Sequence, residues 1–213
     1  MKIQSITLPL LGVALSAFLA STPSAFAQEA ENLIKNPSFE EKGAEGQSVI
    51  ARWGNRIRGD VPELKPSFTQ AQNGQDGKAA ARFDVPRFES PSKKPGMVEC
   101  FQSVRVHPGT RYFFSVYSRS GDLASCWLHA DIEQLSTASP EVFAENTKAV
   151  STEESDETKG QANEWHLHEA TIKTGPETNY LRVSLRMQDV GATGVGGGWV
   201  EFSNAKLIEL PPE

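Results

Sequence analysis

The chain has 213 residues, of which 38% are hydrophobic and 23% are charged, and this apolar content is enough for one folded domain with a single core. Its formal charge of −6 at pH 7 gives it no electrostatic reason to bind nucleic acid. The same charge would repel a strongly anionic polysaccharide unless a local basic patch overrides it. Two cysteines are too few for a metal site built from thiolates alone.

Residues 1–27 have the layout of a secretory signal peptide. Lys2 precedes an apolar run over residues 6–20, and Ala25-Phe26-Ala27 forms a small-x-small cleavage site. A membrane anchor is the competing interpretation, but the run is short for a bilayer span. We therefore predict that residues 28–213 form one mature domain that is secreted, periplasmic or held at the cell surface.

Alternation of apolar and polar residues predicts half-buried strands along most of the mature chain. Gly, Pro and polar residues mark turns at 107–110 and 120–122, and residues 59–75 indicate a loop or a short edge strand. No long helical period and no internal repeat is seen, so the predicted fold class is all-β, a β-sandwich jelly roll of two antiparallel sheets. The predicted strands cover residues 33–34, 78–85, 98–106, 111–119, 124–133, 164–174, 180–188 and 199–210.

The acidic residues 151–160 have little to bury, which predicts a solvated loop. A calcium-binding loop is the functional alternative, although the regular spacing of oxygen ligands is missing. The preceding residues 142–150 are compatible with a short helix. The glycine-rich residues 191–198 predict a turn, because they lack the following Lys-Ser/Thr of a phosphate-binding loop.

Cys100 and Cys126 both fall on the apolar, inward phase of their predicted strands. Disulfides persist in the oxidising compartments that a signal peptide leads to, so we expect these two residues to be bonded across the core. Two buried free thiols are the alternative.

Aromatic and charged side chains occupy the outward phase of the strands predicted at 111–119 and 124–133. If residues 120–124 make a hairpin, the two strands lie side by side and these side chains share one solvent-facing surface. An aromatic plane beside charged donors and acceptors suits sugar binding. The predicted ligand-binding residues are Tyr117, Arg119, Trp127, His129 and Asp131, with Arg186 from another strand and Trp53 as a wall on a loop.

Two interpretations without a ligand platform stay open. In the first, Trp127 packs beneath the long polar insertion, and Arg119 and Asp131 form a surface ion pair that contributes little. In the second, His166 and His168 share a strand face and bind zinc together with His129.

An enzyme would need catalytic groups among the same outward side chains. Tyr117, His129 and Arg119 are the residue types that a polysaccharide lyase uses, and Asp131 and Glu133 share a strand face as paired carboxylates would. No recognisable catalytic motif surrounds any of them, so we expect a protein that is not an enzyme.

Several segments occur in a familiar order. Residues 32–40 read NLIKNPSFE and are followed by Trp53, residues 102–112 read QSVRVHPGTRY, Glu164-Trp165 opens a later strand, and residues 198–207 read GWVEFSNAKL. In this order they resemble the signature of carbohydrate-binding modules of the family 4/9 type, over nearly all of residues 32–209. The resemblance implies a galactose-binding-like jelly roll that is non-catalytic and binds β-glucan or xylan chains.

The same resemblance implies a structural calcium held by an acid in the first segment and another in the last. Glu40 is present, but Ser203 and Asn204 stand where the second acid would be. Calcium prefers several charged oxygens, so Glu40 and Asn204 would hold it weakly, and we expect no cofactor.

The leading hypothesis is therefore a secreted carbohydrate-binding module that recognises a polysaccharide or another glycan on the solvent face of one sheet. The runner-up is a cell-surface or adhesion module that contacts proteins. Its mark would be an exposed apolar patch in place of a mixed aromatic and polar face.

Overall fold

The structure is a computed structural model that describes residues 30–45, 48–59, 61–90, 93–137, 150–151, 164–192 and 194–212. The predicted signal peptide, the helix considered from residue 142 and the acidic residues 152–160 lie outside these ranges. The described residues contain no helix, and hence none that is long and apolar enough to cross a membrane.

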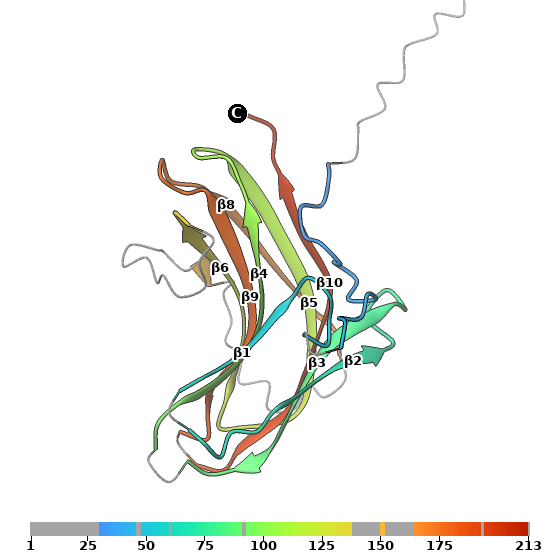
Figure 1. Ribbon diagram of the computed structural model, residues 1–213, viewed down its shortest axis with the longest axis vertical. Coiled ribbons are helices and arrows are strands. Elements are labelled where there is room, and N and C mark those ends of the chain that lie inside the picture. The colour runs from blue at the N-terminus through green and yellow to red at the C-terminus, as the bar shows by residue number, and fades with distance from the viewer. Residues whose placement is uncertain are drawn as a thin grey trace, which may run out of the picture.

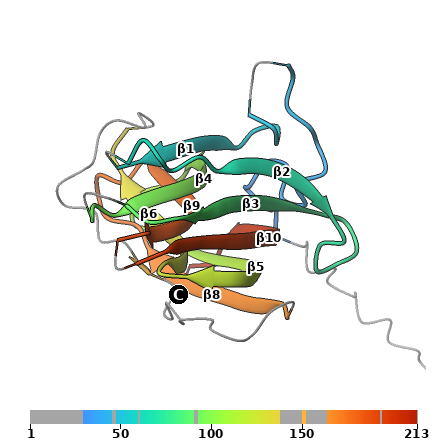
Figure 2. The same cartoon turned by 90° about the horizontal axis from the view of Figure 1, so that it is seen from below.

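The described strands form two five-stranded antiparallel sheets packed into a sandwich (Figure 1). The first sheet contains, in spatial order, β1 (Gly54–Arg58), β4 (Gly96–Arg105), β9 (Tyr180–Val190), β6 (Trp127–Leu135) and β7 (Val150–Ser151). Figure 2 shows the strands of the second sheet side by side: β2 (Ser67–Gln72), β3 (Ala79–Phe88), β10 (Gly196–Glu209), β5 (Arg111–Ala124) and β8 (His166–Lys173). The all-β sandwich predicted from the sequence is confirmed.

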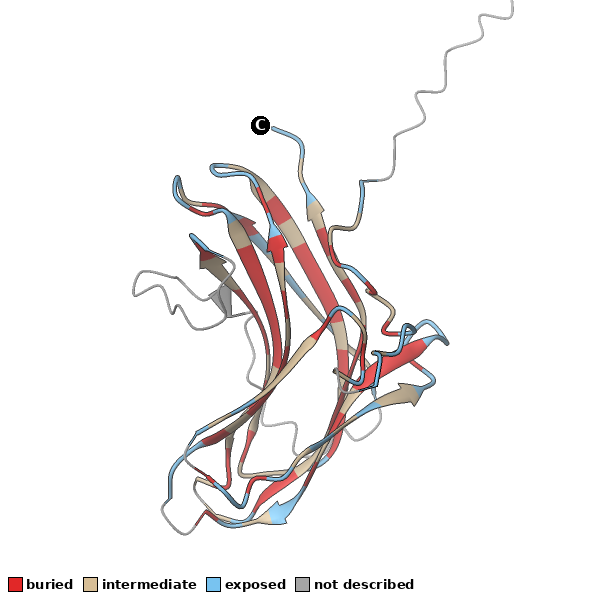
Figure 3. Cartoon of the chain, in the orientation of Figure 1, coloured by how far each residue is buried: buried red, intermediate tan, exposed pale blue. Residues whose placement is uncertain are grey.

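The core lies between the sheets because alternate residues of each long strand are apolar. In β9, Leu181, Val183 and Leu185 are completely buried against the second sheet. Figure 3 shows this burial as red segments along the long strands of both sheets. Aromatic side chains from the second sheet fill the other side of the core, and they are Phe83, Tyr112, Phe114 and Phe202.

Both sheets bow in the same direction (Figure 1), so the outer face of the first sheet is concave and that of the second is convex. We call these surfaces the concave face and the convex face. Side chains that alternate with the core residues of β4, β9 and β6 lie on the concave face, and those of β3, β10 and β5 lie on the convex face.

The hairpin predicted at residues 120–124 is wrong. Strand β5 continues through Gly121 to Ala124, and the chain then crosses to β6 in the other sheet. Gly121 pairs with Trp199 of β10, and a Cβ atom at Gly121 would lie 2.5 Å from atoms of the indole ring. The glycine therefore permits the indole to lie close to the strand, and it does not mark a turn.

The strand predicted at residues 33–34 does not appear among the described elements. The Leu33 N–H donates to the Leu207 carbonyl at 2.8 Å, and side-chain hydrogen bonds hold much of the rest of this segment, because amides can replace ladder partners. The side chain of Asn36 donates to the carbonyl of Glu41 and accepts from its N–H. Gln102 of β4 pairs with both the N–H and the carbonyl of Lys35 at 2.8 and 2.9 Å. Residues that carry the family resemblance thus anchor the N-terminal segment.

The predicted disulfide is also wrong, because Cys100 and Cys126 are both buried free thiols. They face inward as expected, but β9 separates β4 from β6. Cys100 lies opposite Leu185, which lies opposite Ala130, four positions beyond Cys126. Strands are about 4.8 Å apart and advance about 3.3 Å per residue, so the two cysteines are too distant for the roughly 7 Å limit between bonded Cα atoms.

Candidate functional site

Side chains of β1, β4, β9 and β6 form rows across the concave face, because antiparallel register places residues directly opposite each other. The central row contains a base, an acid, a second base and an imidazole. In order across the strands, these are Arg56, Glu99, Arg186 and His129. The row on one side contains Gly54, Phe101, Ser184 and Asp131, and the next contains Ser103, Arg182 and Glu133. On the other side of the central row, Arg58 faces Met97 and Gln188 faces Trp127.

Glu99 is the buried acid at the centre of these rows, with a side chain only 1% exposed. Its Oε2 atom accepts hydrogen bonds from Nε and Nη2 of Arg56 at 2.9 and 2.7 Å, and Nε of Arg58 lies 3.6 Å away. Its Oε1 atom accepts from the hydroxyl of Ser184 at 2.8 Å. A buried carboxylate needs such partners, so Glu99 fixes the two arginines in place on the concave face.

A second group of ion pairs lies on the β6 side. Arg186 forms an ion pair with Asp131 and lies 3.8 Å from Glu133, and Arg182 approaches Glu133 at 3.4 Å. The side chains of Arg182 and Asp131 are 0% and 1% exposed. These contacts hold the charged groups in defined positions, which is what recognition of a rigid ligand requires.

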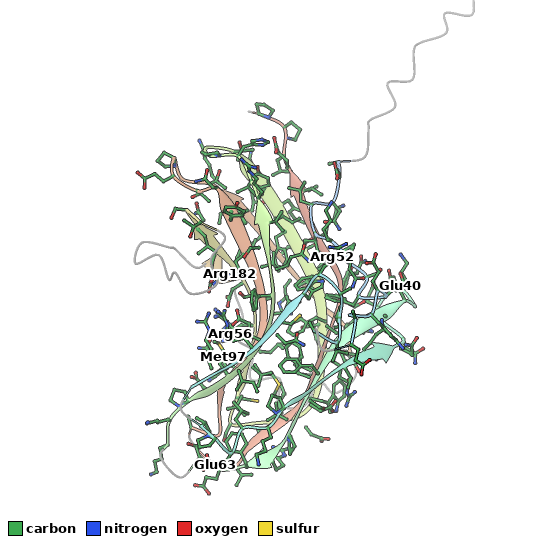
Figure 4. All side chains as sticks on the ribbon, viewed as in Figure 1. Glu40, Arg52, Arg56, Glu63, Met97 and Arg182 are labelled. Atoms are coloured by element: carbon green, nitrogen blue, oxygen red, sulfur yellow. The ribbon has the colours of Figure 1, made fainter. Side chains whose placement is uncertain are left out.

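Phe101 supplies an aromatic plane in the middle of the face. A Cβ atom at Gly54 would lie 2.7 Å from the Phe101 ring, so the glycine allows the ring to lie over β1. The guanidinium carbons of Arg56 and Arg182 lie 4.7 and 5.6 Å from the ring centroid. Figure 4 shows Arg56, Arg182 and Met97 gathered on the concave side of the sheet. Cation–π contacts from both arginines stabilise this arrangement.

His129 and Trp127 lie at the β6 side of the same surface, and both are half-buried. Burial lowers the pKa of His129 below its ordinary value of 6.5; Asp131 opposes this shift and Arg186 adds to it. The imidazole is therefore neutral at pH 7, and a neutral imidazole can both donate and accept a hydrogen bond.

Four predicted ligand residues come together on the concave face, namely Trp127, His129, Asp131 and Arg186. Trp53 does not join them: it is 1% exposed, packs on Phe39 with ring centroids 5.0 Å apart and donates its indole N–H to the Asn36 carbonyl. The prediction of Trp53 as a loop wall is wrong, because it is a core residue.

Tyr117 and Arg119 lie on the convex face, on the opposite side of the sandwich from the other four. The predicted alternation of inward and outward residues was correct for both strands, but the two strands belong to different sheets. Arg119 donates to Glu201 at 2.6 Å, and its guanidinium carbon lies 4.5 Å from the ring of Trp165. The surface ion pair considered between Arg119 and Asp131 is therefore also wrong, since each has a partner in its own sheet.

The convex face carries a second array of charged and aromatic groups around the buried Glu201. Arg82 donates to Glu201 at 2.9 Å and to both oxygens of Asp84 at 2.8 and 2.6 Å. Its guanidinium carbon lies 4.5 Å from the ring of Trp199. This array shares its chemistry with the concave face, and each of its two carboxylates has an arginine partner.

The zinc hypothesis is wrong in its geometry. His166 and His168 lie on β8 of the second sheet, and His129 lies on the outer face of the first. The hydroxyl of Ser118 is 2.6 Å from Nε2 of His168, and burial lowers the pKa of that imidazole, with His166 contributing in the same direction. No group of three or more His, Cys, Asp or Glu side chains that could hold a metal occurs within the described ranges.

The residues considered for calcium have other partners. The Glu40 carboxylate accepts from the Ser38 hydroxyl at 2.7 Å, and the Gln70 amide nitrogen lies 2.6 and 2.8 Å from the carbonyls of Phe39 and Glu40. An amide donor thus occupies carbonyl oxygens that a cation would otherwise use. Weak or absent calcium binding at Glu40 and Asn204 remains our prediction.

The sequence analysis missed the residues at the centre of the concave face. Glu99 and Phe101 occupy the outward phase of β4, the strand whose inward phase holds Cys100. Arg56 and Arg58 lie on β1, a five-residue strand without a clear apolar alternation. Arg182 alternates with the buried Leu181 and Val183 of β9, and a sheet order that placed β9 between β4 and β6 would have joined it to the others.

No protein-family model matches the sequence, and no curated protein matches it either. Among solved structures, a cyclase from Fischerella sp. TAU in complex with 4-(1H-indol-3-yl)butan-2-one aligns with a TM-score of 0.53 at 17% identity, over 86% of this chain and 100% of the cyclase. The CBM22-1 xylan-binding domain of Paenibacillus barcinonensis Xyn10C aligns with a TM-score of 0.50 at 13% identity, over 86% of this chain and 97% of that domain.

The enzymatically active domain of tailspike protein 4 from bacteriophage CBA120 aligns with a TM-score of 0.52 at 13% identity. The alignment covers 84% of this chain, but the chain spans only 21% of the tailspike domain. The structural neighbours are mainly carbohydrate-binding modules with β-sandwich folds. At these identities the likeness establishes the fold, and function has to be argued from the residues of this chain.

Proposed function

We propose that the protein is a secreted, non-catalytic carbohydrate-binding module whose glycan ligand lies on the concave face. The fold is one that is common among carbohydrate-binding modules, and the family 4/9 resemblance of the sequence supports the same class. The observation that carries the proposal is the meeting of aromatic planes and fixed hydrogen-bonding groups on one curved sheet surface.

Each part of this surface has a role in the proposed recognition. Phe101 and Trp127 offer ring planes for the C–H face of a pyranose, and His129 offers a donor and an acceptor for a hydroxyl group. Arg56 and Arg186 present guanidinium groups that can form paired hydrogen bonds to adjacent ligand oxygens. Because ion pairs already fix these side chains, little conformational entropy is lost when the ligand binds.

The carboxylates on this face do not favour a glycosidase. Hydrolysis by a carboxylate pair needs one carboxyl group to donate a proton to the leaving oxygen. Asp131 forms an ion pair with Arg186, and Glu133 is approached by both Arg182 and Arg186. Both acids are thus engaged with cations, so positioning a ligand is the role that their contacts support.

The described surface does not show the exposed apolar patch expected of a module that contacts proteins. The exposed large apolar side chains of the described ranges are Val49, Ile57, Leu167 and Val195, and they come from four separate segments. Single exposed apolar residues are normal on soluble proteins.

Affinity electrophoresis of residues 28–213 tests the proposal. The gels contain xylan, mixed-linkage β-glucan, β-1,4-galactan, dextran, dextran sulfate or polygalacturonate. We expect at least one polymer to retard the protein, and Trp127→Ala to weaken that binding about tenfold or more through loss of a stacking plane. Trp165→Ala is the matched control, because it removes a half-buried tryptophan that contacts Arg119 on the convex face.

Both variants should keep a cooperative thermal transition. Binding of Trp127→Ala that equals wild-type binding, with Trp165→Ala reducing it instead, would move the site to the convex face. Absence of retardation by every polymer in the panel would contradict the proposed function.

A further inference from the structure

Trp127 is the first residue of β6, so ladder pairing continues along the chain on one side of it only. It lies opposite Gln188 of β9, where the pairing of these two strands ends. Phe101, the other ring plane of the concave face, lies inside β4 and has paired residues on both sides of it. The position of the Trp127 indole therefore depends on the backbone that precedes it, at residues 124–126.

This backbone crosses from the second sheet to the first through a strained bend. Ser125 has a φ of 43°, and Asp189, the residue after Gln188, has a φ of 56°. Such left-handed values are uncommon for residues other than glycine and persist only where the surroundings impose them. Both strained residues adjoin the end of the β6–β9 ladder, where Trp127 reaches the concave face.

Three glycines between the end of β9 and the start of β10 contact this bend. The Gly191 N–H donates to the Ser125 carbonyl at 3.1 Å, and Sγ of Cys126 lies 3.9 Å from the Gly197 carbonyl oxygen. Gly196 packs on both sides of the first contact, because a Cβ atom there would lie 2.2 Å from the Gly191 nitrogen and 3.1 Å from the Ser125 carbonyl oxygen. We call Gly191, Gly196 and Gly197 the glycine junction.

The glycine junction has no room for side chains. Gly191 and Gly197 have φ values of 75° and 130°, which residues with a Cβ atom rarely adopt. A methyl group on Gly191 would lie 2.9 Å from the Phe88 ring, and one on Gly197 would lie 2.7 Å from the Val85 carbonyl oxygen. Contacts on several sides therefore hold the junction in place, and through it the bend that leads into Trp127.

We propose that the glycine junction is a positioning element of the glycan site, which holds the Ser125 bend and thereby sets where the Trp127 indole lies on the concave face. This inference rests on the proposed function and adds the residues that fix one of its ring planes. The glycines act through Trp127 and not by contacting the sugar. A binding site has to be held within about 0.5 Å of its productive geometry, so a backbone shift at the bend affects recognition.

Gly196→Ala is the first test, because its methyl group overlaps the Gly191 nitrogen and must move the junction. We expect this variant of residues 28–213 to bind the polymer that retards the wild type about tenfold or more weakly in isothermal titration calorimetry. In ¹⁵N NMR spectra without ligand, its Trp127 indole N–H signal should shift relative to wild type, while that of Trp165 on the convex face should stay in place.

Gly74→Ala is the matched control, because it adds a methyl group to another buried glycine, in the turn between β2 and β3. This methyl group would lie 2.3 Å from the Ala79 carbonyl oxygen, an overlap with backbone as close as that at Gly196. Both variants should melt at a lower temperature than wild type, but Gly74→Ala should keep wild-type affinity per folded molecule. The pair separates a general loss of stability from displacement of Trp127.

Two substitutions at Ser125 test the bend itself. Asparagine tolerates a left-handed φ, whereas the branched Cβ of valine opposes it. Both variants keep the backbone carbonyl that accepts from Gly191. We expect Ser125→Asn to retain wild-type affinity and Ser125→Val to bind about fivefold or more weakly. This pair decides the question if Gly196→Ala does not fold.

Each outcome bears on one proposal or the other. Wild-type affinity in Gly196→Ala, an unmoved Trp127 signal in that variant, or an equal loss of affinity in Gly74→Ala overturns the positioning role and leaves the proposed function in place. Equal affinity of Ser125→Asn and Ser125→Val overturns it as well. If no polymer retards the wild type, the proposed function fails, and the Trp127 signal of Gly196→Ala still decides the positioning role because it needs no ligand.

Discussion

Gly54 decides where the ring of Phe101 lies on the concave face. A methyl group at this position would overlap the ring at 2.7 Å, so Gly54→Ala must displace the end of the Phe101 side chain. We expect stability to change by less than about 1 kcal/mol, because the ring end can shift and alanine loses less backbone entropy than glycine. We expect glycan affinity to fall about fivefold or more, because a stacking plane moves.

Calorimetric titration and thermal unfolding of Gly54→Ala check this prediction. Gly194→Ala is the control, because its added methyl group meets only the Ser125 hydroxyl, at 3.4 Å. Unchanged affinity in Gly54→Ala would show that Phe101 is not a ligand plane, and the concave site would then depend on Trp127 alone.

For single residues, the sequence predicts which face of its strand a side chain occupies better than it predicts what that side chain does. Trp127, His129 and Asp131 lie outward as the period of two requires, because the pleat is a local property of each strand. Trp53 follows no such alternation, and its burial depends on Phe39 and on the Asn36 carbonyl, which are distant contacts. Local patterns carry no information about contacts of that kind.

Among the elements, β5 and β6 show what the sequence could not predict. A turn that continues one sheet and a turn that crosses to the other leave the same alternation in the flanking strands. The choice is made by the neighbours: β10 and β8 pair with β5, and β9 pairs with β6. Because the pairing was missed, the predicted site combined residues from both outer faces.

The N-terminal segment depends on Asn36, whose side-chain amide donates to the carbonyls of Glu41 and Ala51, at 3.0 Å each. Its oxygen accepts from the Glu41 N–H at 3.1 Å, and its φ of 51° is one that asparagine tolerates better than alanine. We expect Asn36→Ala to lower the free energy of unfolding by about 3 kcal/mol.

Urea denaturation measures this loss. Gln72→Ala, an exposed position on the edge strand β2, should stay within about 0.5 kcal/mol of wild type. A loss below about 1 kcal/mol in Asn36→Ala would mean that the signature asparagine is not a structural anchor, and a ligand role for it would have to be considered.

At the scale of the whole molecule, the two sheets carry different surfaces on one scaffold. The core requires only that inward residues be apolar, so the outer faces are free to differ in curvature and charge. The concave face combines ion-paired arginines with the rings of Phe101 and Trp127, and the convex face carries a separate array of charged and aromatic groups around Glu201. The sequence predicts the sandwich because alternation defines it, while the difference between the faces emerges only from the strand order.

The four tryptophans report on the location of the ligand in a single experiment, because they lie in three distinct environments. Trp53 is in the core, Trp127 is on the concave face, and Trp165 and Trp199 are on the convex face. The measurement is a ¹⁵N NMR titration of residues 28–213 with an oligosaccharide of the polymer that retards the protein. Binding on the concave face predicts that the indole N–H signal of Trp127 shifts while the other three stay in place. A shift of the Trp165 or Trp199 signals, with Trp127 unmoved, would contradict it.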